Sequence, residues 1–113
     1  MVLSGKIDLK DLIQNGNCFF PDMIKFCVDI KRRKVCIDDE MHIDMEHMLY
    51  DDGSAYEDIY GGNIMTDCDP YQVVWEAHPN IERNRMLGGY GRLITDEKTL
   101  SVLSDILYEW VFF

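Results

Sequence analysis

The sequence predicts an α+β fold in the order α-ββ-α-ββ-α, with a four-stranded, mainly antiparallel sheet and helices packed on one face. Three patterns predict this fold. Residues 23–30 with 34–39, and residues 58–65 with 71–78, form two pairs of strand-like segments with short connections, which is typical of antiparallel strands. A helical pattern lies between the two pairs. A second, strongly amphipathic helical pattern follows the last pair.

The size and charge of the chain limit its organisation and its partners. A chain of 113 residues fits one compact domain that spans residues 1–113. The net charge of −10 argues against nucleic acid or an anionic membrane as the main partner, because both are negatively charged. No apolar run approaches the roughly 20 residues of a membrane helix, and the first residues lack the apolar stretch of a signal peptide. We therefore expect a soluble, cytoplasmic protein.

The four cysteines, Cys18, Cys27, Cys36 and Cys68, contain no CxxC pair. A zinc site needs a tighter spacing than theirs, so we expect buried free thiols, as is usual in a cytosolic protein. Cys27 and Cys36 fall on neighbouring predicted strands, and one possible register places them opposite each other. The register and the redox state of this pair stay open, because the connecting turn lacks glycine and asparagine.

A short helix is predicted at residues 8–15, before the first strand. Asp8 is its expected N-terminal cap, and Gly16 is expected to end it in a left-handed conformation. A loop that contains Asn17 and Pro21 then leads to the sheet.

The first strand pair has a clear apolar face. Lys25 and Asp29 face away from that side, and the second strand directs Val35 and Ile37 inward. The apolar face of the first strand consists of Ile24, Phe26, Val28 and Ile30. The basic run at residues 31–34 is expected to be a solvated turn.

The stretch from Asp38 to Ser54 is the densest group of carboxylates and histidines in the chain. It predicts a helix whose start could be capped by Asp38, Asp39 or Asp44 and whose end is marked by Gly53. One side of this helix is an apolar stripe of Met41, Met45, Met48 and Leu49. We expect the stripe to pack in the core.

The second strand pair, 58–65 and 71–78, is joined by the turn-forming run T-D-C-D-P. Gly61 and Gly62 inside the first of these strands predict a bulge or a close backbone approach. One face of the other strand carries Tyr71, Val73, Trp75 and Ala77. Residues 79–94 are rich in glycine and arginine and are expected to form the longest loop.

The last predicted helix is capped by Thr95 or Asp96. Its apolar stripe consists of Leu100, Leu103, Ile106, Leu107 and Trp110. The chain then reads Val111-Phe112-Phe113. Such an apolar terminus must tuck into the core or contact another chain, so a homodimer through these residues is one prediction.

A divalent-metal site formed by Glu40, His42, Asp44 and Glu46, with His78 as a further ligand, is the sharpest chemical hypothesis. His42 and Glu46 are four residues apart and therefore share one side of a helix. If the preceding strand instead continues through this stretch, alternate residues share one face. Either arrangement gathers ligands for Mg²⁺, Mn²⁺ or Zn²⁺, and a bound metal could activate water for hydrolysis. The alternative is that these groups cap the helix and form its solvated face.

A second candidate site follows the last strand and consists of His78, Asn80, Arg83, Asn84 and Arg85. Guanidinium groups and side-chain amides suit the recognition of a carboxylate or a phosphate. The structural alternative is that the arginines pair with the acidic helix and that His78 simply ends its strand.

Several runs of the sequence resemble a known family. They read V-D-I-K-R-R-K-V-C-I, E-M-H-I-D-M-E-H-M-L-Y-D-D-G-S and D-I-Y-G-G-N-I, with a later N-R. They resemble small prokaryotic proteins catalogued only as a domain of unknown function, which share an E-x-H-x-D-x-E helix start, a D-G-S or N-G-S stop and a G-x-N strand. The matching positions are Glu40, His42, Asp44, Glu46, Gly53, Ser54, Asp58, Gly61 or Gly62, Asn63, Asn84 and Arg85.

This resemblance covers residues 23–107, with two departures. A glycine expected in the first turn is absent at Arg32-Arg33, and the segment around 78–85 aligns poorly, which leaves the turn type and the role of that loop open. Since the family is uncharacterised, the resemblance implies no activity.

Two functions follow from these patterns. The first is a non-enzymatic binding or interaction domain, acidic and oligomeric, whose partner is an unidentified protein or small molecule. The second is a metal-binding protein or metal-assisted hydrolase. The second function requires Glu40, His42, Glu46 and an asparagine or arginine of residues 80–85 to converge in one cleft.

Overall fold

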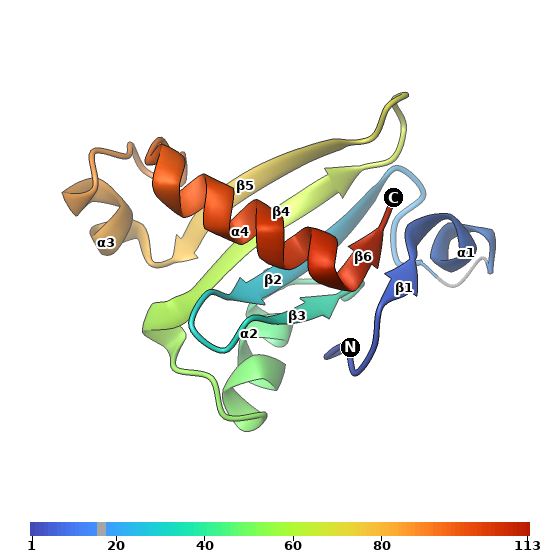
Figure 1. Ribbon diagram of the computed structural model, residues 1–113, viewed down its shortest axis with the longest axis horizontal. Helices are drawn as coiled ribbons and strands as arrows, with labels where there is room; N and C mark the ends of the chain where they lie inside the picture. Colours follow the sequence, from blue (N-terminus) through green and yellow to red (C-terminus); the bar gives the residue numbers. More distant parts are fainter. Residues whose placement is uncertain (16–17) are drawn as a thin grey trace.

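The computed structural model describes residues 1–15 and 18–113 and contains a four-stranded antiparallel sheet of order β3-β2-β4-β5 (Figure 1). Its strands are β2 (Met23–Asp29), β3 (Lys34–Ile37), β4 (Ile59–Met65) and β5 (Gln72–Pro79). The helices are α1 (Leu9–Gln14), α2 (His42–Asp51), the short 3-10 helix η1 (Tyr56–Asp58), α3 (Ile81–Met86) and α4 (Glu97–Trp110). The predicted α+β class is confirmed. Gly16 and Asn17, for which a helix stop and a loop were predicted, lie outside the described residues.

The helices cover both faces of the sheet, not one face as predicted (Figure 1). The α4 face contains Ile24, Phe26, Val28, Leu103, Ile106 and Leu107. The α2 face contains Cys27, Cys36, Met45, Leu49 and Ile59. The prediction was wrong because Cys27 and Cys36, with Ile59 of β4, form a small apolar patch on the second face, and this patch also has to be covered.

The first hairpin has the register that places Cys27 opposite Cys36. Both are buried free thiols, and burial raises their pKa values. The turn forms without glycine because the Asp29 carboxylate accepts hydrogen bonds of 2.9 Å from the backbone N–H groups of Lys31 and Arg32. Arg33 adopts the left-handed conformation with φ of 54°.

The basic turn is less solvated than predicted. Arg32 donates to Ser54 Oγ at 2.9 Å and forms an ion pair of 3.0 Å with Asp52. Arg33 forms an ion pair with Glu109 of α4. The turn therefore links the end of α2 to the end of α4.

α2 begins at His42 and has Met41 at its N-cap position, with no hydrogen bond from the Met41 side chain. The predicted aspartate cap is therefore wrong, since Asp38 instead turns the chain out of β3 with φ of 62°. The predicted end is confirmed, because Gly53 follows the helix with φ of 111°. The predicted core stripe is only partly buried. Met45 and Leu49 are inaccessible, whereas Met41 and Met48 are exposed.

The bulge predicted at Gly61 and Gly62 is confirmed, whereas the space beside Gly62 is filled by a side chain and not by a neighbouring backbone. The pairing of β4 with β5 shifts between Tyr60 and Gly61, from Tyr60 opposite Pro79 to Gly61 opposite Glu76. Residues 77–78 of β5 therefore have no opposite residue and form a bulge. A Cβ atom added to Gly62 would clash with the ring of Phe26, which lies directly opposite on β2, so the ring occupies the space of a side chain at this position.

The segment after β5 was predicted to be a loop, but it contains α3 and an isolated bridge between Tyr90 and Leu93. α4 agrees with its prediction. Asp96 caps it by accepting a 3.0 Å hydrogen bond from the backbone N–H of Thr99, and the hydrogen bonds from Thr99 lower the pKa of Asp96. Among the residues described, no helix is long and apolar enough to cross a membrane.

The end of the chain forms a short parallel pair that the sequence did not predict. β6 (Val111–Phe112) pairs with β1 (Ile7–Asp8) and brings the two ends of the chain together (Figure 1). Val111 is buried, but Phe112 is 60% exposed. The terminus is thus tucked in at Val111 and leaves one large apolar ring in solvent.

The homodimer through the C-terminal residues stays a prediction, and Phe112 is the residue that tests it. Replacing Phe112 with serine removes the exposed ring without touching the core, so we expect a dimer to become monomeric and the folded protein to keep its stability. Light scattering at several protein concentrations measures this change. A wild-type protein that is monomeric throughout would remove the predicted interface.

Candidate functional site

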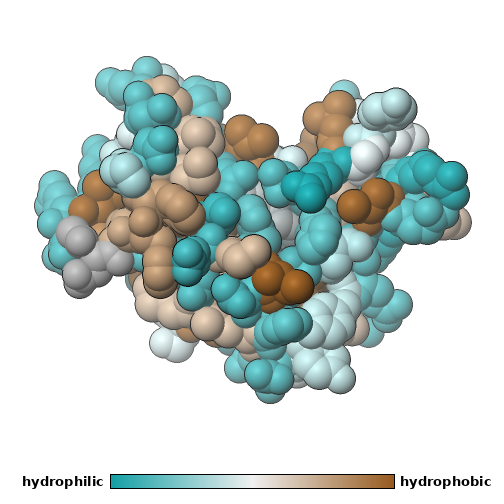
Figure 2. Space-filling view, turned by 180° about the vertical axis from the view of Figure 1, so that it is seen from behind, coloured by the Kyte–Doolittle hydropathy of each residue, from teal (hydrophilic) through white to brown (hydrophobic). Residues whose placement is uncertain are grey.

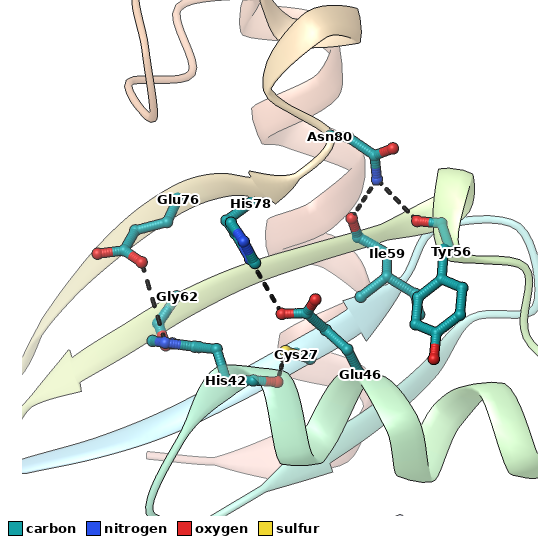
Figure 3. A network of polar contacts seen from close by, with 9 residues as sticks. All are labelled: Cys27, His42, Glu46, Tyr56, Ile59, Gly62, Glu76, His78 and Asn80. Atoms are coloured by element: carbon teal, nitrogen blue, oxygen red, sulfur yellow. Dashed lines mark hydrogen bonds and ion pairs between the residues drawn. The ribbon is translucent and has the colours of Figure 1, made fainter.

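Helix α2 and strand β5 are joined by two histidine–glutamate pairs (Figure 3). Nδ1 of His78 lies 3.1 Å from Oε2 of Glu46, and Nδ1 of His42 lies 3.9 Å from Oε2 of Glu76. Each element supplies one histidine and one glutamate. His42 and Glu46 are four residues apart on a helix, and Glu76 and His78 are two apart on a strand, so each pair of neighbours projects from one side of its element. The two elements therefore exchange partners reciprocally.

Glu46 is the buried member of this group. Its side chain is 3% exposed, whereas that of His78 is 37% exposed. A carboxylate so far from water needs a hydrogen-bond donor or a positive charge, and His78 supplies one. Since a carboxylate only accepts hydrogen bonds, Nδ1 of His78 carries the hydrogen. The Nε2 atom of the same ring is left for a ligand or for water.

His42 is held by the backbone of β4. Its Nε2 atom lies 2.8 Å from the carbonyl oxygen of Gly62, so Nε2 carries a hydrogen. Attraction between Nδ1 and Glu76 then requires the doubly protonated ring. A Cβ atom on Gly61 would lie 3.2 Å from Cδ2 of His42, so the absent side chain leaves room for the ring. Glu76 is also contacted by Nδ2 of Asn63, at 3.5 Å.

Cys27 lies beneath this group and is not a reactive thiol. Its Sγ atom donates to the carbonyl oxygen of His42 at 3.7 Å (Figure 3). Burial raises its pKa well above the usual value, and the negative charge of Glu46 adds to that shift. The thiol is therefore protonated and serves packing.

A groove of about 300 Å³ opens beside the histidines on the α2 side of the sheet. It is lined by Lys25, Met41, His42, Ile43, Glu76, His78 and Arg92. Within residues 1–15 and 18–113, neither Lys25 nor Arg92 has a carboxylate oxygen within 4 Å. Figure 2 shows the molecule from this side, where apolar atoms gather in the half that includes the grey residues and hydrophilic atoms predominate in the other half.

The four residues predicted to bind metal do not come together. Glu40 and Asp44 are exposed, Glu46 is buried against His78, and His42 points to Gly62. The alternative in which the strand continues is wrong, since β3 ends at Ile37. Among the described residues, no three histidine, cysteine or acidic side chains are placed to hold a metal ion. These residues therefore do not fit the predicted divalent-metal site.

The predicted ligand cluster is also divided. Asn80 donates to the carbonyl oxygens of Tyr56 and Ile59, at 3.0 and 2.5 Å. Asn84 is buried and donates to two other carbonyl groups, while exposed Arg85 pairs with Glu82. Of this cluster, only His78 reaches the groove.

Three charged groove residues were not predicted as site residues, namely Lys25, Glu76 and Arg92. The sequence did contain a signal for Glu76. Glu76 and His78 are two residues apart on a strand and share one face, just as His42 and Glu46 share one side of a helix. Lys25 and Arg92 carry no local signal. They meet because β2 and β5 belong to one sheet and because the carbonyl oxygen of Arg92 accepts a 2.9 Å hydrogen bond from the backbone N–H of Ala77.

Comparison with known proteins gives one match. A family model described as "Protein of unknown function (DUF5674)" matches residues 1–109. A search of curated proteins and a search of solved structures each found no match. The predicted resemblance to an uncharacterised domain family is confirmed, and the match is longer than the predicted range of residues 23–107.

Proposed function

The chain belongs to the DUF5674 family of proteins of unknown function, and we propose that it is a binding domain that holds a small anion in the groove beside α2 and β5. The anion is a carboxylate or a phosphate group of a small molecule. One observation carries the proposal, namely that Lys25 and Arg92 line the same groove without a carboxylate partner among the described residues.

The charge of the chain makes this pair of cations unusual. The protein has 21 acidic side chains and 11 lysines and arginines, so basic side chains have many possible partners. Glu76 is the carboxylate among the described lining residues, and its nearest polar neighbours are Nδ1 of His42 at 3.9 Å and Nδ2 of Asn63 at 3.5 Å. The ammonium of Lys25 lies 4.9 Å from the centroid of the Phe20 ring, a contact that leaves its hydrogen-bond donors for an anion. An arginine can bind both oxygens of a carboxylate or phosphate, and a lysine adds a point charge.

Both histidines, His42 and His78, line this groove, and each ring is held in place by a neighbouring group. Glu46 fixes the orientation of the His78 ring, and Gly62 fixes that of His42. Side chains that are held before a ligand arrives lose little conformational entropy on binding, which favours affinity. A volume of about 300 Å³ suits a ligand of metabolite size.

The test is a titration of labelled protein with succinate, inorganic phosphate and a phosphomonoester, followed by amide chemical shifts. We expect shifts at residues around Lys25, His78 and Arg92. Because a hydrogen bond to a charged group contributes about 1.5–3 kcal/mol, Arg92→Gln should weaken binding roughly 10-fold to 100-fold. Comparison of the three ligands distinguishes carboxylate from phosphate recognition.

The double variant Lys31→Met/Lys98→Met is the matched control, since it removes two positive charges outside the groove. It should bind as the wild type does, whereas Lys25→Met/Arg92→Gln should not bind measurably. Equal affinities of these two double variants would contradict the proposal. So would the lack of any response to all three anions at 10 mM, because weak specific binding has a dissociation constant of about 1 mM.

A further inference from the structure

A second cavity, with a volume of about 650 Å³, lies beside the turn between β4 and β5. The turn between β4 and β5, helix α1 and the C-terminus come together at this end of the molecule (Figure 1). The turn contributes residues 66–71, α1 contributes Lys10, and the C-terminal region contributes Tyr108 and Phe113. The volume is in the range of pockets that enclose small organic molecules.

Aromatic rings form the apolar part of this cavity. Tyr108 and Phe113 contact each other edge to face, with ring centroids 5.1 Å apart, and Tyr71 lines the cavity from the turn. Tyr71 and Phe113 also pack against the main core, which fixes their positions. Rings that are held in this way present flat faces to a ligand ring and, through their electron-rich faces, to a cation.

Charged groups at the cavity favour a positive ligand. Asp67 and Asp69 lie on the turn, and Lys10 lies on α1. None of the three forms an ion pair within the part of the chain that the structure describes. Two carboxylates against one ammonium leave the cavity negative, and the net charge of −10 attracts cations from further away.

From these features we infer that the cavity binds an organic cation that carries an aromatic ring, such as an arylalkylammonium ion. The ring stacks among Tyr71, Tyr108 and Phe113, and the ammonium group lies near Asp67 and Asp69. This site is independent of the anion groove, because the cavity and the groove share no lining residue.

Three probes of one shape test the inference: 2-phenylethylammonium, 2-phenylethanol and phenylacetate. We expect the cation to bind about threefold to tenfold more tightly than the alcohol, because a cation–π contact and the carboxylates favour it, and the anion to bind most weakly. Amide shifts at residues 66–71 and 108–113 locate the site. The inference would be overturned if phenylacetate bound as tightly as the ammonium ion. It would also be overturned if no probe gave a response at 10 mM, because weak specific binding has a dissociation constant of about 1 mM.

Two variants separate the contributions of charge and ring. Asp67→Asn/Asp69→Asn should remove the preference for the cation, while Asp51→Asn/Glu57→Gln, which removes equal charge elsewhere, should keep it. Tyr108→Leu keeps an apolar wall and should weaken cation binding more than alcohol binding. A cation affinity equal in the two double variants would show that the aspartates play no part and would refute the charged site.

Discussion

Replacing Gly62 with alanine is expected to lower the free energy of unfolding by about 3 kcal/mol, the upper range for overpacking a core. The added Cβ would lie 2.4 Å from Cζ of Phe26. Phe26 is inaccessible to solvent, and its ring packs edge to face on Trp75 with centroids 5.0 Å apart, so it has no space to move into. The reduced entropy of the unfolded chain offsets less than about 1 kcal/mol of this loss. Urea unfolding followed by tryptophan fluorescence measures the change.

Gly5→Ala is the control for this variant, because a Cβ atom at Gly5 meets nothing within 4 Å. Its stability should stay within about 0.5 kcal/mol of the wild type. Phe26→Leu in the Gly62→Ala background should recover part of the loss, since the smaller side chain makes room for the methyl group. If Gly62→Ala and Gly5→Ala unfold at the same urea concentration, the Phe26 ring is not the reason for the glycine at position 62.

Replacing Asn84 with aspartate is expected to cost about 3 kcal/mol or more, although the two side chains have the same shape. Asn84 is 2% exposed, and its Nδ2 atom donates to the carbonyl oxygens of Gly91 and Leu93 at 3.1 and 2.7 Å. A carboxylate cannot donate, so both carbonyl groups lose the amide donor and face a buried negative charge, and Leu93 keeps only the 3.2 Å hydrogen bond from the backbone N–H of Tyr90. Hydrogen exchange should show residues 88–94 opening first.

The exposed amide Gln14 provides the matched control, since Gln14→Glu makes the same chemical change in solvent. It should alter stability by less than about 0.5 kcal/mol. The effect of Asn84→Asp should also depend on pH. A buried carboxyl without a positive partner binds its proton more tightly when folded than when unfolded, so lowering the pH should restore stability and raising it should not. Equal exchange rates of residues 88–94 in Asn84→Asp and wild type would refute this role of the amide.

Elements whose signals are local could be predicted from the sequence. α4 is an example, because its capping residue Asp96 and its apolar stripe lie within one segment. The cysteine register needed one more piece of information, the turn geometry that Asp29 supplies. The placement of α2 could not be predicted, because the sequence of a short strand does not show whether a helix covers one of its faces or both.

The candidate site depends on contacts between distant segments and was therefore only half predictable. His42 and Glu46 were placed on one side of a helix, but their partners on β5 depend on the bulge at residues 77–78. The amides of Asn80 and Asn84 were interpreted as ligand groups. In the folded chain Asn80 donates to backbone carbonyl groups of η1 and β4, and Asn84 donates to those of the irregular segment before α4, which no sheet or helix supplies with donors.

The two-sided cover of β2 and β3 separates the part of the sheet that is buried on both faces from a part of β5 that is open to solvent. α2 packs over β2 and β3, whereas on the same side β5 exposes Gln72 and Val74. Substitutions on that open side of β5 remove little buried surface and cost little stability, while those between the helices are costly. The open side of β5 can therefore change in sequence while the core stays the same.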